Sequence, residues 1–128
     1  MENQKSALGM DGNVTALLGY LIGIVALVLI FIEKDNKFVR FHAFQSVLWT
    51  ALCVIGIFII AIVGGILAVI LAQVSGTLGS IVGLVLMLVY FGAIIALIGG
   101  HIYGAIKAYG GAMFKLPVVG NFAEKWSN

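Results

Sequence analysis

The chain has 128 residues, of which 62% are hydrophobic and 9% are charged, and its formal net charge is +2. Soluble domains carry charged side chains at about a quarter of their positions, and no soluble fold of this size has enough polar surface to cover the uncharged run from Phe41 to Ile106. We therefore expect one integral membrane domain, residues 1–128, and no nucleic acid as a partner.

The first expected span covers residues 14–32, which carry no charge and would extend about 28 Å as a helix. The polar head before it is expected to be mobile up to Asp11 or Asn13, either of which could cap the helix. A cleaved signal peptide fits poorly, because the run ends in the charged sequence IEKDNK without a small-residue cleavage site. The head also lacks the Arg and Ser content of an organellar transit peptide, which favours a prokaryotic membrane.

Two longer apolar runs follow the charged loop at residues 33–37. The second expected span covers residues 43–72 and the third covers residues 78–106, with the uncharged turn QVSGT between them. Each run exceeds the ~20 residues that a helix needs to cross the hydrocarbon core, so the excess is expected in tilt, bends or projection. The sequence thus predicts an all-α fold: a three-helix transmembrane bundle with an interfacial segment, residues 38–46, before the second span.

The tail, residues 107–128, differs in composition from the spans. Gly110 and Gly111 loosen the helix, and Pro117 prevents its simple continuation. Asn121 to Trp126 could form one amphipathic turn, on which Phe122 and Trp126, four positions apart, would face the lipid headgroups together. The residues expected in this interfacial tail are Lys115, Pro117, Phe122 and Trp126.

The basic residues predict an orientation. With three spans, the 33–37 loop and the tail share one side, which would hold Lys34, Lys37, Arg40, Lys107, Lys115 and Lys125. The other side would hold the N-terminus, the turn at 73–77 and only Lys5. By the positive-inside rule the loop and tail are then cytoplasmic and the N-terminus is outside. A four-span arrangement would weaken this bias, so three spans are preferred.

The stretch FVRFHAFQS at residues 38–46 gathers aromatic and polar side chains between two apolar runs. In one interpretation it lies at the interface, with its aromatic rings at headgroup depth and Arg40 reaching a lipid phosphate or a loop carboxylate. In the other, polar side chains face the bundle as a binding or gating element, and then need polar partners. The candidate residues, called here the polar patch, are Arg40, Phe41, His42, Phe44, Gln45, Ser46 and His101.

His101 joins the polar patch through helix geometry. It lies six residues before Lys107, about 9 Å deeper along the helix, and antiparallel helices bring it to the side and approximate depth of His42. The sequence has no HExxH motif and no cysteine positioned as a ligand, so we expect no metal and no other cofactor. Each histidine is instead expected to bond to a neighbouring helix, with Tyr90 and Tyr103 as candidate partners.

Small residues recur at every fourth position of the third expected span. This stripe consists of Gly92, Ala96, Gly100, Gly104 and Ala108. Such a pattern lets the backbone of another helix approach closely. Shorter versions occur at Gly19–Gly23 and Gly79–Gly83. At least one of these stripes is expected to pack the third helix on the first two. Because three short helices need not occupy all of them, another stripe predicts a contact with another membrane subunit or with a second copy of the chain, beside the contacts with the lipid bilayer.

Three segments together resemble a known family: LLGYLIG in the first span, FVRFHAFQS, and IKAYGGAMFKLPVVGNFAEKW in the tail. They look like the Tic-type family, which includes a chloroplast protein-import component, small bacterial and archaeal relatives of unknown function, and magnetosome membrane proteins of the MamF type. The resemblance runs from about Asn13 to Trp126. Its most specific parts are FHAFQS and the pattern Ala108, Gly111, Lys115, Leu116, Pro117 and Gly120. It implies a subunit of a translocon or of a membrane-associated assembly.

The spans contain no Asp or Glu for acid–base catalysis, and the sequence has no nucleophile elbow or Walker loop. We therefore expect a non-enzymatic accessory, scaffold or assembly subunit that acts through helix packing. The alternative is a translocon- or transporter-like conduit formed by an oligomer, with a polar path near His42, Gln45 and His101.

Overall fold

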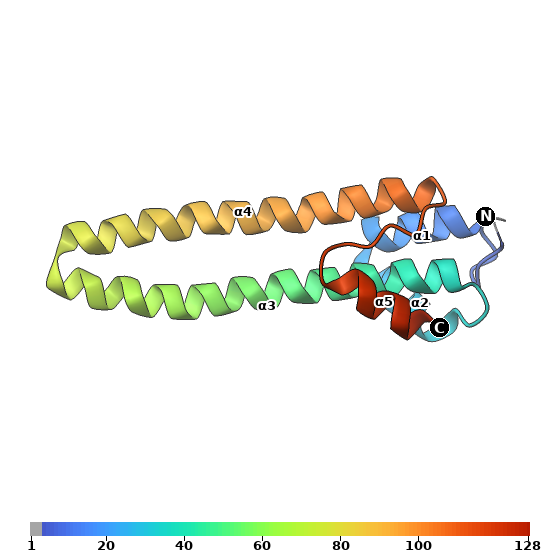
Figure 1. The fold of residues 1–128 in the computed structure, drawn as a ribbon, viewed down its shortest axis with the longest axis horizontal. Helices are drawn as coiled ribbons and strands as arrows, with labels where there is room; N and C mark the ends of the chain where they lie inside the picture. The colour runs from blue at the N-terminus through green and yellow to red at the C-terminus, as the bar shows by residue number, and fades with distance from the viewer. Residues whose placement is uncertain (1–3) are drawn as a thin grey trace. The chain divides into compact units, whose positions relative to one another are not determined.

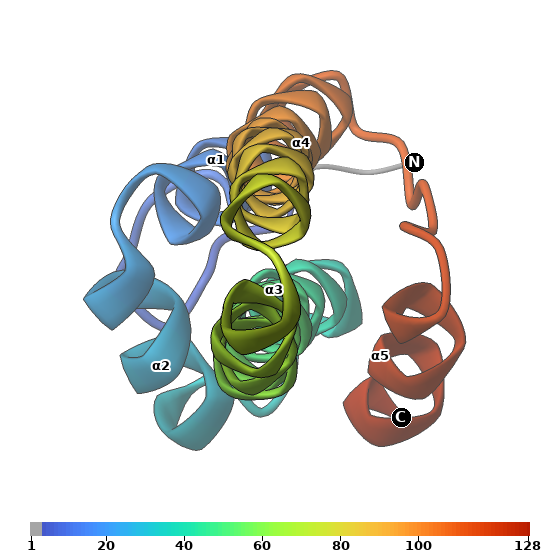
Figure 2. The same cartoon turned by 90° about the vertical axis from the view of Figure 1, so that its left-hand side faces the viewer.

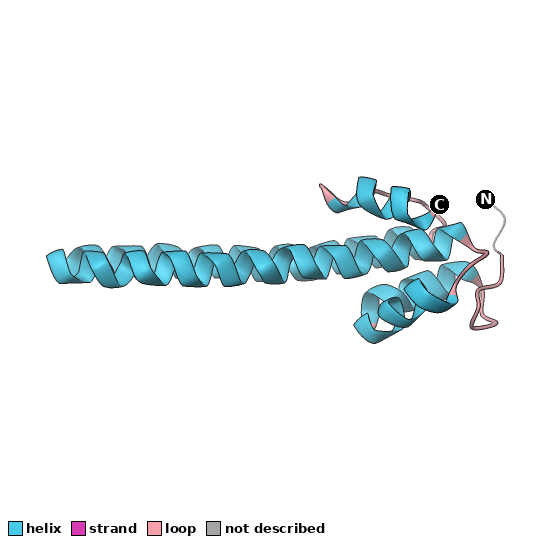
Figure 3. Ribbon diagram, turned by 90° about the horizontal axis from the view of Figure 1, so that it is seen from below, coloured by secondary structure: helices cyan, strands magenta, loops and turns pink. Residues whose placement is uncertain are grey.

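A computed structural model describes residues 4–128, which form helices and connecting loops (Figures 1 and 3). The helices are α1 (Gly12–Leu21), α2 (Gly23–Ile32), α3 (Lys37–Val74), α4 (Gly76–Tyr109) and α5 (Val119–Ser127). The predicted all-α class is confirmed for this part of the chain. Among the described helices only α3 and α4 are long and apolar enough to cross a membrane, so the expected bundle of three spans is not confirmed.

The first expected span, residues 14–32, is divided into two helices. Ile22 has extended backbone angles, φ −126° and ψ 99°, and ends α1 before α2 begins. Each helix has ten residues and a length of about 15 Å, half the ~30 Å hydrocarbon core. The two helices pack closely, since a Cβ atom built on Gly19 would lie 3.6 Å from the Cβ atom of Ala26. Neither helix alone is long enough to span a membrane.

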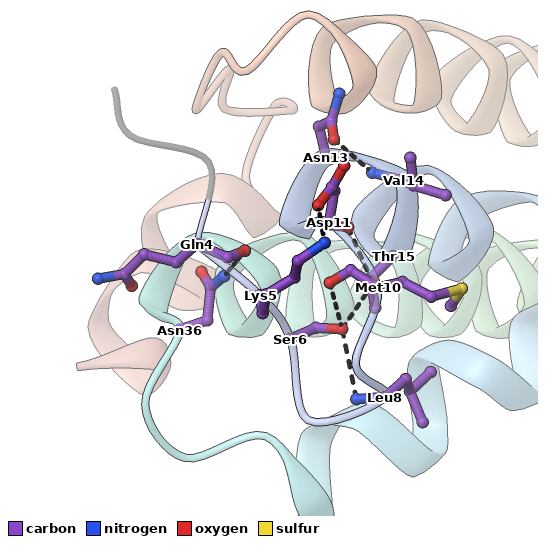
Figure 4. Close-up of polar contacts among 10 residues, drawn as sticks. All are labelled: Gln4, Lys5, Ser6, Leu8, Met10, Asp11, Asn13, Val14, Thr15 and Asn36. Carbon is purple, nitrogen blue, oxygen red and sulfur yellow. Dashed lines mark hydrogen bonds and ion pairs between the residues drawn. The ribbon is translucent and has the colours of Figure 1, made fainter.

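The head is folded against the loop that follows α2. The backbone carbonyl of Gln4 accepts a hydrogen bond from the backbone N–H of Gly12, 2.9 Å. The same carbonyl accepts from the side chain of Asn36, 3.0 Å, as Figure 4 shows. Lys5 and Asp11 form an ion pair within the head. The expectation of a mobile head is therefore wrong for residues 4–11, and its residues 1–3 lie outside the described part of the chain.

Glu33 joins the head to the loop a second time. Glu33 is 2% exposed, and its carboxylate accepts hydrogen bonds from the backbone N–H of Ala7, 2.7 Å, and of Asn36, 3.1 Å. The chain thus leaves the head along α1 and returns along α2 to the same place. These contacts hold the head and the loop side by side, whereas the expected topology put them on opposite sides of the membrane.

The chain divides into two compact units. The first contains residues up to Thr50 together with Ile98–Asn128, and the second contains Ala51–Leu97. In the second unit α3 and α4 run antiparallel on either side of Ser75. A Cβ atom on Gly79 would lie 2.6 Å from the Cβ atom of Ala72, so glycine is needed for this close approach beside the turn.

The first unit surrounds the first turns of α3. The helices α1 and α2 lie on one side of these turns and α5 lies on the other (Figure 2). The buried hydrophobic cluster draws side chains from all five helices and from the segment before α5; it includes Ala16, Tyr20, Leu29, Val39, Ala43, Ala105, Leu116 and Val119. The segment 38–46 is therefore at the centre of this unit.

Candidate functional site

The polar side chains of FVRFHAFQS point into the first unit. His42 and Gln45 are 0% exposed and Ser46 is 1% exposed. Of the two interpretations drawn from the sequence, the geometry matches the inward-facing one. The aromatic belt expected at headgroup depth does not form at Phe38 and Phe41, because both rings are buried and stand edge-on to the ring of His42.

Tyr20 of α1 is the centre of the hydrogen-bond network. Its hydroxyl lies 2.9 Å from Nδ1 of His42 and 2.7 Å from Nε2 of Gln45. Nε2 of His42 lies 3.1 Å from the carbonyl oxygen of Ala112, so that nitrogen carries the proton and Nδ1 accepts from the tyrosine. The tyrosine oxygen then accepts from the Gln45 amide. Every polar atom of these three side chains has a partner inside the chain.

The network holds the segment that connects α4 to α5. Gln45 donates to the carbonyl of Phe114, 2.9 Å, and accepts from the backbone N–H of Leu116, 2.8 Å. His42 donates to the carbonyl of Ala112. A segment without helical hydrogen bonds leaves its backbone groups unsatisfied unless side chains bind them. His42 and Gln45 perform this task, and in doing so they fasten the tail to α3.

His101 belongs to the same region, as its position in the sequence predicted. Its Nε2 atom lies 3.0 Å from the hydroxyl of Thr50 and 3.5 Å from that of Ser46. Ser46 also donates to the carbonyl of Gly19, 2.9 Å. The rings of His42 and His101 both stand edge-on to Tyr20, at centroid distances of 5.6 and 6.1 Å. The partners expected from the sequence were different tyrosines: Tyr103 instead packs edge-on against Phe114.

Arg40 and Phe44 of the polar patch contact the end of the tail. A guanidinium N–H of Arg40 donates to the carbonyl of Trp126, 3.4 Å, and the guanidinium lies over the Phe44 ring. The Phe44 ring stands edge-on to the Trp126 ring. Arg40 therefore has a partner in the tail rather than the loop carboxylate that the sequence suggested.

Around Pro117 the tail makes a tight turn and then forms α5. Val118 has φ 67° and ψ −58°, and the N–H of Val119 donates to the carbonyl of Pro117, 2.7 Å, which together define a γ-turn. Lys115 forms an exposed ion pair with Glu124. On α5, Phe122 and Trp126 are about half exposed. Their rings lie 6.0 Å apart.

The small-residue stripe of α4 is divided between two environments. Within the first unit Gly104 touches the Tyr20 ring, Gly100 touches the Trp49 ring, and Ala108 is fully buried. These three residues serve packing inside the chain. Gly92 and Ala96 lie in the second unit and are exposed, and a Cβ atom on Gly92 would meet nothing within 4 Å.

A cavity of about 520 Å³ lies beside the network rather than within it. It is lined by Gln4, Asn13, Asp35, Asn36, Lys37, Phe38, Tyr109, Gly110, Gly111 and Met113, and no residue of the polar patch is among them. The alternative hypothesis of a polar path near His42, Gln45 and His101 required these side chains to border an open space. His42 and Gln45 are instead enclosed.

Sequence reasoning missed Tyr20 and the backbone of residues 112–116. A signal for Tyr20 was present, since a tyrosine hydroxyl in an apolar run needs a polar partner. The backbone groups carry no such signal, because every residue type has them. No group of three or more His, Cys, Asp and Glu side chains that could hold a metal ion occurs in the part of the chain that the structure describes.

Known proteins similar to this chain are membrane proteins of archaea. A UPF0132 membrane protein of Methanocaldococcus jannaschii is 35% identical, and the match covers 96% of this chain and 94% of the relative. A second UPF0132 membrane protein from that organism is 34% identical, and the match covers 94% of this chain and 73% of the relative. A UPF0132 membrane protein from Archaeoglobus fulgidus is also 34% identical, and the match covers 91% of this chain and 95% of the relative. No solved structure matches the chain.

These relatives and the two long apolar helices support a prokaryotic membrane as the location of this protein. The expected likeness to the magnetosome proteins is also confirmed, while the link to chloroplast import is not shown. A family model described as the magnetosome magnetite crystal formation protein family matches residues 4–123. This match covers nearly the whole chain, and the chain belongs to that family.

Proposed function

We propose that this protein is a non-enzymatic structural subunit of a membrane assembly, and that it acts by packing its helices against another membrane protein or a second copy of itself. The observation that carries the proposal is the outward-facing small-residue surface of α4 at Gly92 and Ala96. Close backbone approach at small residues is a main source of helix association in lipid.

The use of the polar patch supports the same proposal. His42, Gln45 and Tyr20 bond to one another and to the tail, so their polar atoms hold the fold together. A fastened tail presents a fixed surface, with Phe122 and Trp126 half exposed on α5. A subunit that works by contact benefits from such rigidity, because less ordering free energy is lost when it binds.

The family description points in the same direction. It names magnetite crystal formation, a process of the magnetosome, and the proposal takes from it a role in a membrane-bound assembly. The tail offers a second contact region, since Lys115, Glu124 and Lys125 are exposed beside the aromatic residues of α5. This region would face lipid headgroups or the polar part of a partner.

The first experiment is purification of the tagged chain from its native membrane in a mild detergent, followed by mass spectrometry and native mass determination. We expect a defined oligomer or a defined set of accompanying membrane proteins. A monomer without accompanying proteins, together with unchanged membrane complexes in a deletion strain, would refute the proposal.

A pair of variants locates the contact. Gly92→Leu places a bulky side chain on the proposed surface without meeting any atom of the chain within 4 Å of the new Cβ. Gly83→Leu is the matched control. A Cβ atom on Gly83 also meets nothing within 4 Å, and its separation of nine residues from Gly92 places it on the opposite side of the helix. We expect Gly92→Leu to reduce association by tenfold or more, as a rough scale for a lost close-packed contact, and Gly83→Leu to preserve it.

A further inference from the structure

We propose that α1 and α2 form a re-entrant hairpin that inserts into the acyl chains of a single membrane leaflet. Its two ends are polar and its tip is apolar. At the polar end, the head and the loop after α2 are joined through Glu33 and Asn36. At the tip, Leu21 and Ile24 are 62% and 70% exposed.

The lengths of the helices limit how deep the tip can go. Each helix has ten residues and rises about 15 Å, while the hydrocarbon core is about 30 Å thick. A hairpin that begins and ends at the polar surface can therefore reach no further than the middle of the bilayer. Backbone within lipid must have its hydrogen bonds satisfied, and at the tip the N–H of Ile22 donates to the carbonyl of Leu18, 2.8 Å.

The position of the apolar surface indicates that lipid acyl chains cover it. The buried face of the hairpin already packs inside the first unit through Ala16, Tyr20, Ala26 and Leu29. The opposite face is exposed and apolar, and includes Leu27, Val28 and Phe31. An exposed apolar face next to a charged end is the pattern of a segment that rests in one leaflet, with its polar end in the headgroups. Acyl chains of that leaflet are the surroundings such a face requires.

The basic residues indicate which leaflet this is. The head, the 33–36 loop and the end of α4 meet at one place, because Asn13 also donates to the carbonyl of Tyr109, 3.1 Å. All seven Lys and Arg residues of the sequence lie outside residues 51–97, in the segments belonging to this first unit. By the positive-inside rule that face is cytoplasmic. The N-terminal head, the loop and the tail then share the cytoplasmic side.

A functional consequence follows from insertion on one side. The hairpin adds area to the cytoplasmic leaflet and none to the other leaflet. Elements that insert into one leaflet bind in a curvature-dependent way. The protein should therefore concentrate where the membrane curves strongly with its cytoplasmic leaflet outermost, as on a small vesicle budded into the cytoplasm.

Cysteine labelling tests the topology. In a Cys53→Ala background, four single variants are made: Leu8→Cys in the head, Lys34→Cys in the loop, Thr77→Cys beside the α3–α4 turn, and Ile24→Cys at the hairpin tip. A membrane-impermeant maleimide is added to sealed native membrane vesicles of known orientation. We expect Leu8→Cys and Lys34→Cys to label from the cytoplasmic side and Thr77→Cys from the other side.

The tip variant distinguishes lipid from water. We expect Ile24→Cys to label from neither side of intact vesicles and to label fully after unfolding in detergent. Labelling of Ile24→Cys in intact vesicles would overturn insertion into lipid. Labelling of Leu8→Cys and Lys34→Cys from opposite sides would overturn the hairpin and restore a spanning first segment.

Liposomes of graded size test the curvature consequence. An Asn128→Cys variant, also in the Cys53→Ala background, is reconstituted, and each vesicle is scored for molecules labelled from outside and for those labelled only after permeabilisation. We expect the ratio of outward-facing to inward-facing molecules to rise at least twofold from the largest to the smallest vesicles. The inward-facing molecules on the same vesicles are the control. A ratio that does not change with vesicle size would refute curvature preference.

Discussion

Replacing Gln45 by Leu should release the tail from α3. Gln45 is 0% exposed and makes three hydrogen bonds: to the Tyr20 hydroxyl, to the carbonyl of Phe114, and from the N–H of Leu116. Leucine has a similar volume but no polar atom, so all three bonds are lost while the packing volume is nearly kept. A net contribution of about 1 kcal/mol per hydrogen bond gives a loss of about 3 kcal/mol.

The loss should appear mainly as local opening. The residues between α4 and α5 have few hydrogen bonds of their own, so the free energy of opening this segment falls more than that of the helices. Two of the three bonds join Gln45 to this segment, and their loss of about 2 kcal/mol corresponds to roughly a thirtyfold change in the equilibrium constant for its opening. We expect the amide of Leu116 to exchange with deuterium roughly thirtyfold faster in micelles, and a protease to cleave near residues 112–118 sooner.

A matched control separates this effect from the chemical change itself. Gln73→Leu makes the same substitution at an exposed position of the second unit and should leave exchange at Leu116 unchanged. If Gln45→Leu leaves the exchange rate and the cleavage rate within twofold of the parent chain, as a rough tolerance for a surface substitution, the role assigned to the network is wrong.

Three further changes are measured as shifts in unfolding midpoint in micelles. Gly104→Ala should destabilise the protein by about 1–3 kcal/mol, because the new methyl group would lie 2.5 Å from the Tyr20 ring. The control Gly92→Ala should be neutral, because its Cβ meets nothing within 4 Å. Equal effects of the two substitutions would contradict the packing described. Val118→Gly should stabilise the protein by up to about 1 kcal/mol, because glycine adopts the positive φ of this position without strain. A loss of stability would show that the backbone at Val118 is not strained. Glu124→Gln breaks an exposed ion pair and should cost under about 1 kcal/mol; a larger cost would mean that the pair anchors α5.

The location of the site was predictable and its bonding was not. The crowding of His42, Gln45 and Ser46 in an otherwise apolar sequence marked them as residues that need partners, and helix geometry brought His101 to the same region. The partners themselves are a tyrosine from α1 and backbone groups of residues 112–116, about 70 positions away. A backbone carbonyl leaves no trace in the sequence, so only the folded chain identifies it.

The sequence by itself determined the class of protein, because hydropathy and run length are local properties. Residues 43–72 and 78–106 are uncharged and long, and they lie within the helices α3 and α4. Residues 14–32 satisfied the same criteria as a third span, yet they form two short helices. No proline and no charge marks the break at Ile22. Tertiary structure decided it: Gly19 packs on Ala26, and Glu33 and Asn36 bind the head, contacts that a single straight helix could not make.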